Sequence, residues 1–206
     1  MRIEKLEKSN SQQGRVLVHL EGGDLLRITE EELLRFDLYT GLDISPEDVV
    51  KLKKCAAQSE ARTRAAGMIA ARPLSRKELQ KRLCGKGAQE EDAAAAADWL
   101  EEIGALDDLA YAKMLVRRYS ETGYGAARLR DELFRRGVPR ELWDEALAEA
   151  IDPGEAIARI VASRTKGAPL DEKGRKRLAD YLLRRGFSWN EVKPAISALG
   201  ADIEEE

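Results

Sequence analysis

Three copies of one hydrophobic pattern organise the chain. In the central copy, Leu129 and Leu133 are four residues apart, so both side chains lie on one helix face. Gly137 follows four residues later, where a glycine in the left-handed conformation would end the helix. The same spacing occurs at Leu79, Leu83 and Gly87 and again at Leu178, Leu182 and Gly186.

The three copies repeat with a nearly constant period. They are 50 and 49 residues apart, counted from residue 79 to 129 and from 129 to 178. A base precedes each glycine, and an acid follows it four or five residues later. A single leucine pair carries little information, but three pairs with one glycine offset indicate internal repeats. Each copy predicts two helices joined by a turn, and one further helix completes a three-helix unit.

The N-terminal segment has a different pattern, in which apolar and polar residues alternate. It predicts short strands at residues 1–5, 15–20 and 25–28, with a turn at 21–24. So small an antiparallel sheet is not expected to be stable without support from helices.

Capping residues mark the starts of the helices that follow. Thr29 and Glu32 have the spacing of a capping box, and a long helix is predicted from Pro46 to about Arg72, ended by Pro73. Further capping boxes precede helices at Ser75 and Ser188. The other helices before the third copy are predicted at residues 89–103, 107–120 and 153–164.

These elements predict a mostly α fold, in which tandem three-helix repeats form an elongated curved body behind a small β-rich segment. No repeat alone could bury both faces of its helices, so the repeats should stack. We expect a β-plus-helix segment at residues 1–55, repeats at 56–103, 104–150 and 151–200, and an acidic tail at 201–206.

Composition and charge narrow the function classes. Of the 206 residues, 35% are charged and 5% are aromatic, which favours long solvated helices over a β-sandwich. Residues 1–59 carry nine bases and eleven acids, residues 60–200 carry 26 and 23, and residues 201–206 carry four acids. The small basic excess of the middle block argues against strong autonomous binding to DNA.

Candidate chemistry is sparse. Cys55 and Cys84 are too few for a disulfide framework or a cysteine-rich zinc site, and His19, the single histidine, lies in a predicted strand. No phosphate-binding loop or dinucleotide fingerprint occurs. The sequence therefore predicts no catalytic site, metal or cofactor. Without a signal peptide or a membrane-spanning apolar run, the expected location is the cytoplasm.

A repeated arrangement of bases remains, which we call the basic ridge. Arg128 and Arg135 lie seven residues apart on a helix face away from the leucine pair, and Arg177 and Arg184 repeat this spacing. Each base alone is better explained as a solvated helix end, where cations complement the dipole. The repetition favours a partner-binding surface. The ridge comprises Arg117, Arg118, Arg128, Arg135, Arg136, Lys173, Arg175, Lys176, Arg177, Arg184 and Arg185.

Several motifs resemble those of the RecX family of bacterial recombination regulators. RPLSRKEL at residues 72–79, followed by Leu83, is similar to that family's first-repeat signature. GALDD at 104–108, followed by Tyr-Ala, resembles its next motif, and residues 123–137 resemble its second-repeat segment. The resemblance covers about residues 60–200.

The resemblance implies a non-enzymatic protein that binds the RecA filament on single-stranded DNA and lies in its groove. It would restrain recombinase, ATPase and co-protease activity, and hence recombination, DNA repair and the SOS response. A second hypothesis is a direct nucleic-acid-binding module, with Arg128, Arg135, Arg177 and Arg184 on phosphates. A third is a scaffold without nucleic acid, which requires the motif match to be accidental.

The repeats also predict an elongated monomer in solution, because a linear array grows along one direction and ends in capping segments. Small-angle scattering should give the profile of an extended particle with the mass of one chain. The profile of a compact sphere, or a stable dimer at low concentration, would contradict this prediction.

Overall fold

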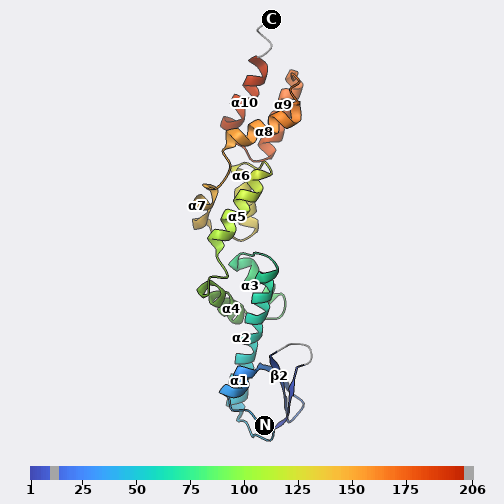
Figure 1. Ribbon diagram of the computed structural model, residues 1–206, viewed down its shortest axis with the longest axis vertical. Helices are drawn as coiled ribbons and strands as arrows, with labels where there is room; N and C mark the ends of the chain where they lie inside the picture. The colour runs from blue at the N-terminus through green and yellow to red at the C-terminus, as the bar shows by residue number, and fades with distance from the viewer. Residues whose placement is uncertain (10–13, 202–206) are drawn as a thin grey trace. The chain divides into compact units, whose positions relative to one another are not determined.

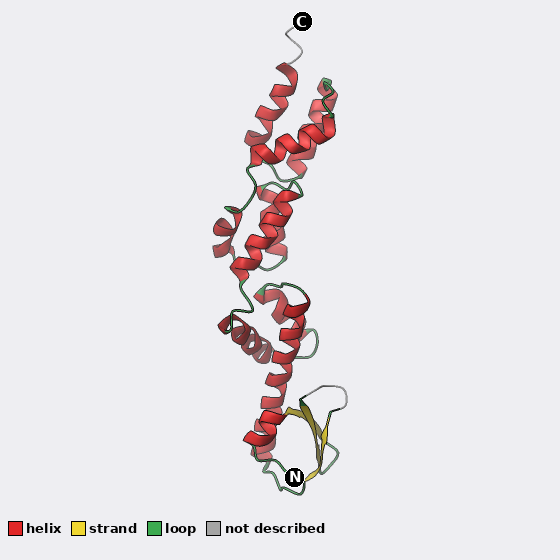
Figure 2. Ribbon diagram, viewed as in Figure 1, coloured by secondary structure: helices red, strands yellow, loops and turns green. Residues whose placement is uncertain are grey.

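The computed structural model describes residues 1–9 and 14–201, without the side chains of 200 and 201. Contacts divide the chain into two compact units, one of residues 1–73 and 79–106 and the other of residues 74–78 and the chain from 107 onward. Helices dominate both, and the described strands lie in the first unit (Figures 1 and 2). The predicted mostly α fold is confirmed. The five-part division stays a prediction, and most of the expected acidic tail, residues 202–206, lies outside the described residues.

The first unit begins with an antiparallel sheet in the order β1-β2-β3. The strands are β1 (Ile3–Lys8), β2 (Arg15–Leu20) and β3 (Leu25–Thr29). Strand β1 extends three residues beyond its predicted end, because Lys8 still pairs with Val16 of β2. Alternation places one face of the sheet in the core, which includes Ile3, Val16, Val18, Leu20, Leu26 and Ile28.

Two capped helices follow as predicted. Thr29 caps α1 (Glu30–Arg35) in a complete capping box with Glu32, and Ser45 caps α2 (Pro46–Ala71). The first half of α2 covers the sheet with Val49, Leu52 and Ala56. The small sheet, which is not expected to be stable without support from helices, is thus stabilised by the start of a 26-residue helix.

The second half of α2 packs against α4 (Glu90–Glu102) through small side chains. Ala61 and Ala65 of α2 are buried, as are Ala93, Ala96 and Ala97 of α4. Alanine favours the helical conformation and lets two helix backbones approach closely. The packing role predicted for the alanine run is therefore confirmed. Helix α3 (Arg76–Cys84) lies between α2 and α4 in the sequence, and both leucines of the first copy, Leu79 and Leu83, are completely buried on it.

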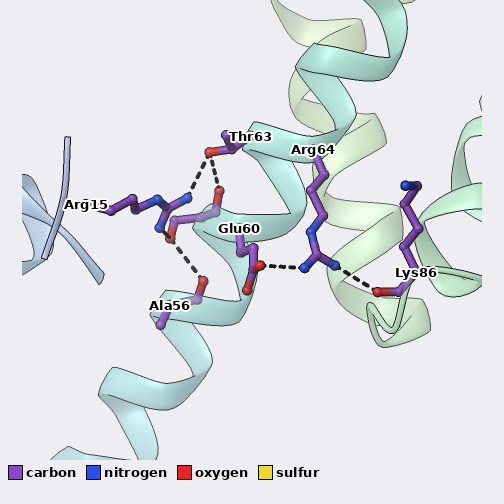
Figure 3. A network of polar contacts seen from close by, with 7 residues as sticks. Arg15, Ala56, Glu60, Thr63, Arg64 and Lys86 are labelled. Carbon is purple, nitrogen blue, oxygen red and sulfur yellow. Dashed lines mark hydrogen bonds and ion pairs between the residues drawn. The ribbon is translucent and has the colours of Figure 1, made fainter. Parts of the chain in front are cut away.

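Polar contacts fix α2 on two sides (Figure 3). The buried Arg15 of β2 donates to Ser59 Oγ at 2.7 Å and to Thr63 Oγ1 at 2.8 Å. Arg64, the residue directly after Thr63, donates to the Lys86 carbonyl at 2.8 Å. The sheet and the α3–α4 turn are thus both hydrogen-bonded to the same helix.

The second unit contains the helices of the central and third copies. These are α5 (Asp108–Glu121), α6 (Ala126–Arg135), α7 (Trp143–Leu147), α8 (Pro153–Thr165), α9 (Glu172–Arg184) and α10 (Trp189–Ala201). The second helix that the central copy predicts begins as a 3₁₀ turn, η1 (Arg140–Leu142), and its α-helical part is short.

Each of these two copies has its own apolar core. Leu129 and Leu133 pack with Tyr111, Leu115 and neighbouring residues of α5 to α7. Leu178 and Leu182 pack separately with residues of α8 to α10, including Ile157 and Phe187. The contact that joins the two copies must therefore come from other groups.

Backbone hydrogen bonds join the central and third copies at the start of α6. The N–H groups of Gly125 and Ala127 donate to the carbonyls of Arg185 and Gly186 at 2.9 and 3.1 Å. No side chain caps α6, so the α9–α10 turn supplies acceptors for N–H groups that a helix start leaves unpaired. A Cβ on Gly125 would lie 2.5 Å from the Gly186 carbonyl carbon, so this joint requires glycine.

An equivalent contact occurs one copy earlier, within the second unit. Ser75 Oγ accepts from the Glu78 N–H at 3.1 Å and donates to the carbonyl of Arg136, the counterpart of Arg185. Gly137 lies directly beside this joint, with φ +75°, and the three repeat glycines all have positive φ. The predicted left-handed conformation is therefore confirmed.

Gly137 should consequently be intolerant of any side chain. In Gly137→Ala the alanine backbone would have to keep the left-handed conformation, and its Cβ would lie 3.1 Å from Lys77 Cβ. We expect a loss of about 1–3 kcal/mol in the free energy of unfolding, measured by urea titration.

Gly67→Ala is the matched control. Gly67 lies inside α2 with open space around the Cβ position, so alanine there should stabilise by about 0.5–1 kcal/mol. Equal effects of the two substitutions would show that the Gly137 turn is not the constrained point.

Candidate functional site

The basic ridge lies on α5, α6 and α9 of the second unit and on the residues directly after α6 and α9. Leu129 and Leu133 are each 1% exposed on the inner face of α6. Arg135 is exposed on the same helix, whereas Arg128 is half-buried, with its guanidinium 5.6 Å from the Tyr124 ring centroid. The regular spacing of these bases suggests equivalent surroundings, but in the structure their surroundings differ.

Acids already neutralise most of the α5 and α6 bases. Arg117 donates to Glu149 Oε2 from Nε at 3.1 Å and from Nη2 at 2.8 Å. Arg135 forms an ion pair with Glu132 at 2.9 Å, and Arg128 lies 4.0 Å from Asp131. A base with a neighbouring carboxylate attracts an external anion less strongly than an unpaired one. This part of the ridge is therefore a weak anion site.

Arg136 and Arg185, which occupy the same position in successive copies, have internal partners. Arg185 donates to Tyr181 Oη at 2.8 Å and to the Thr122 carbonyl at 3.0 Å, and it lies 5.1 Å from two tyrosine ring centroids. Arg136 donates to Tyr119 Oη at 3.4 Å, and this hydrogen bond raises the pKa of the guanidinium. The Arg185 side chain thus joins the central and third copies, whereas the Arg136 side chain bonds within the central copy.

Tyrosines and arginines alternate through this region. Tyr119 and Tyr124 stack with centroids 5.6 Å apart, and Arg128 and Arg185 lie over Tyr124. Burial opposes ionisation of Tyr181, but hydrogen bonds and positive charge from Arg164 and Arg185 outweigh it and lower the pKa of the phenol. The rings are occupied by one another and by guanidinium groups.

The bases of α9 are different, because none of them forms an ion pair within the described part of the chain. Lys173, Lys176, Arg177 and Arg184 are exposed, and Arg175 is half-buried. Helix α9 holds these five bases against two acids, Glu172 and Asp180. It therefore carries most of the uncompensated positive charge of the ridge.

Exposed apolar side chains lie next to the bases, which the sequence analysis did not single out. Phe134 precedes Arg135 and is 65% exposed, and Leu183 precedes Arg184 and is 40% exposed. Each directly follows the second leucine of its copy, so the repeat pattern in the sequence could have identified these two exposed apolar positions. Exposed apolar groups beside cations are typical of protein-binding surfaces.

Other candidate chemistry is limited. His19 on β2 lies 3.1 Å from Glu7 Oε2, and Cys55 and Cys84 are half-buried free thiols. Among the residues that the structure describes, no cluster of histidine, cysteine and acidic side chains could hold a metal ion. No helix in the same residues is long and apolar enough to span a membrane.

The fold and this surface define a tandem helical-repeat protein that presents positive charge and apolar side chains to its surroundings. Residues 107–147 match a family model described as RecX, second three-helix domain. The regulatory protein RecX of Stenotrophomonas maltophilia (strain R551-3) is 38% identical over 138 residues, which cover 64% of this chain and 82% of that protein. RecX of Halorhodospira halophila is 35% identical over 156 residues, covering 74% and 97%.

Solved structures agree with this likeness in fold. A crystal structure of regulatory protein RecX superposes with a TM-score of 0.72 and 21% identity over 93% of this chain and 97% of that one. The crystal structure of RecX from Lactobacillus salivarius superposes with a TM-score of 0.62 and 20% identity, over 70% of this chain and 97% of that one. The chain belongs to the RecX family.

Substitutions of two adjacent arginines should distinguish the bases that stabilise the fold from those that are exposed to solvent. Arg185→Ala removes two hydrogen bonds and two ring contacts and should cost about 1–3 kcal/mol in the free energy of unfolding. Arg184→Ala, at an exposed position, should change it by less than about 0.5 kcal/mol. Urea titrations of both variants test this, and similar losses would refute the distinction.

Proposed function

We propose that this protein is a non-enzymatic regulator that binds the RecA filament on single-stranded DNA in the cytoplasm. In doing so it restrains recombinase, ATPase and co-protease activity. Membership of a family whose members are named regulatory proteins supports the regulatory role. The RecA partner is what the motifs of the sequence imply for a member of this family.

The single observation that best supports this function is the uncompensated charge of α9. Lysine and arginine side chains without acidic partners keep their full attraction for phosphates and for acidic protein groups. The exposed Leu183 adjoins Arg184, which adds an apolar contact to a cationic one. A filament made of DNA and protein presents partners for both kinds of group.

The stacked tyrosines of the second unit favour a filament partner over isolated nucleic acid. Base stacking on aromatic rings supplies much of the affinity of proteins that bind single strands without a partner. Here Tyr119 and Tyr124 stack on each other, and Arg128 and Arg185 lie over the Tyr124 ring. Without base stacking, the affinity for isolated nucleic acid would come from phosphate contacts, which are electrostatic and depend on the salt concentration.

The experiment compares two quadruple variants that change net charge equally. The first replaces the exposed α9 bases Lys173, Lys176, Arg177 and Arg184 by alanine. It should bind RecA filaments on single-stranded DNA at least about tenfold more weakly, because each lost charge-assisted contact is worth 1–3 kcal/mol. Its inhibition of the DNA-dependent ATPase and of strand exchange should weaken in parallel.

The second variant replaces bases that already lie beside acids, Lys113, Arg117, Arg128 and Arg135. It should inhibit nearly as well as the unchanged protein. Equal loss in both variants would indicate a general effect of net charge. A folded α9 variant that inhibits normally would show that the filament is bound elsewhere.

A second candidate function is direct binding to nucleic acid, which the unpaired α9 bases also favour. Binding to single-stranded DNA without RecA should then lose affinity steeply with salt, by about one unit of log–log slope per phosphate contacted. Weak DNA binding alone, together with salt-tolerant binding to the filament, would favour the regulator.

A further inference from the structure

The sheet of the first unit has an edge that is only partly covered. Strand β1 pairs with β2 on one side, and no described strand pairs with its other side (Figure 2). The segment at residues 41–44 covers that outer side at the start of β1, where the Ile3 N–H donates to the Leu42 carbonyl at 2.9 Å. From Glu4 to Lys8, no backbone hydrogen bond from the described residues reaches it. A free strand edge can pair with another strand.

The backbone of β1 directs hydrogen-bonding groups outward along this edge. The Ser9 N–H donates to the Arg15 carbonyl at 2.8 Å, so the backbone groups of Ser9 face β2. These groups alternate in direction along a strand, and therefore those of Leu6 and Lys8 face away from β2. Both residues offer a donor and an acceptor to a strand that lies alongside.

A groove with an apolar lining runs along the core side of the same edge. Helix α2 packs over β3, and α1 packs over β2 and β3, whereas Leu6 of β1 is half-buried opposite the fully buried Val18. The groove has a volume of about 430 Å³, and its apolar lining consists of Leu6, Val16, Leu33 and Leu34. Leu34 is 78% exposed. The core is therefore open beside β1, and an added strand would cover it.

The charges of β1 are ordered so that the strand matches a second copy of itself. Residues 4–8 read EKLEK, with an acid and a base on each side of the central leucine. In an antiparallel pair with a two-fold axis at Leu6, this residue faces its own copy. Lys5 then faces Glu7 of the second copy, and Glu4 faces Lys8. Opposite charges on facing residues stabilise a strand pair, and like charges destabilise it.

Other pairings lack this match. A shift by two residues in one direction places Lys5 opposite its own copy, and a shift in the other direction places Glu7 opposite its own. A shift by one residue sets outward backbone groups against inward ones. The strand at the other edge of the sheet, β3, contains no acid that could face Arg27 of a second copy. The charges thus select one edge and one register.

Ion pairs within the chain leave this complementarity intact. Lys5 pairs with Glu7 of the same strand, and Lys8 lies 3.8 Å from Glu30. Exposed pairs of this kind contribute little to stability. In the two-fold arrangement, the Lys5–Glu7 pair meets the reversed pair of the second copy, and the four charges alternate. The match depends on the order of the charges along the strand, which an internal partner does not change.

We propose that two copies of this chain associate through β1, antiparallel and centred on Leu6. The two sheets join into one, and Leu6 of each copy extends the apolar lining of the other's groove. The contact is short, because a β-bulge between Ile3 and Lys5 and the segment at 41–44 limit its length. Small interfaces are weak, so we expect a Kd of about 0.1–1 mM and a monomer at low concentration. This inference needs neither RecA nor DNA and is independent of the function proposed above.

A concentration series of the full chain, followed by amide shifts in nuclear magnetic resonance spectra, tests which edge associates. From about 20 µM to about 1 mM, a range that brackets the expected Kd, the amides of Leu6 and Lys8 should shift. Those of Leu25 and Arg27 on β3 should not, and they serve as the control. Constant shifts at Leu6 and Lys8, or equal changes at both edges, would overturn the proposal.

Charge reversals test the register. Lys5→Glu places acids opposite Glu7 of the second copy, and Glu7→Lys places bases opposite Lys5. Each variant alone should raise the Kd measured by sedimentation equilibrium at least about fivefold, because the contact occurs twice in the dimer. An equal mixture of the two variants should associate about as tightly as the unchanged chain, since acids of one then face bases of the other. Such recovery also excludes misfolding as the cause of the loss.

Lys54→Glu and Glu47→Lys form the matched control pair. They make the same charge changes at exposed positions of α2. Each should alter Kd less than about twofold, as expected for screened surface charges away from the contact. Equal weakening by the control variants would overturn the proposal, because it would indicate an effect of net charge. A mixture of the two β1 variants that associates no more tightly than each variant alone would also overturn it.

Discussion

The second unit depends on a short-range contact between backbones at the start of α6. There the carbonyls of Arg185 and Gly186 accept from the N–H groups of Gly125 and Ala127. Helix starts need acceptors, and here another repeat supplies them in place of a capping side chain. The contact is possible because neither glycine has a Cβ atom. A Cβ on Gly125 would lie 2.5 Å from the Gly186 carbonyl carbon, and a Cβ on Gly186 would overlap the backbone nitrogen of Arg128. The buried apolar cores of the two copies are separate, and these hydrogen bonds and the tyrosine–arginine contacts help to orient one copy on the other.

This joint explains why the repeat unit couples a base to a glycine. The glycine gives the turn its left-handed conformation, and the residue before it places its carbonyl at the preceding copy. The side chain of that residue then binds tyrosines beside the joint, as Arg185 binds Tyr181. A sequence position that looks like part of a binding surface thus acts mainly in assembly of the fold.

The regions that remain for partners are those without internal acids. Exposed ion pairs such as Arg117 with Glu149 contribute little to stability, yet they reduce the charge that a partner would meet. The bases of helix α9 form no ion pair within the described part of the chain. Family membership and the uncompensated charge of α9 together support a regulator that acts on a polyanionic assembly.

The sequence alone determined the helical class, the repeat period and most helix boundaries. Helix periodicity, capping residues and the left-handed glycine are local properties, because they depend on residues within one or two turns. The capping box at Thr29, the stop at Pro73 and the conformation of Gly137 were predictable for that reason. The RecX resemblance was equally local, since it rested on short motifs.

Tertiary structure alone decided which bases have partners. Arg184 and Arg185 are neighbours in one basic doublet, yet the first is exposed and the second bonds to Thr122, 63 residues away. Arg117 is neutralised by Glu149, which lies 32 residues further on. Arg64 donates to the Lys86 carbonyl although 22 residues separate them. Charge compensation acts through space, so a pattern along the chain identifies the bases but not the acids, rings and carbonyls that fold against them.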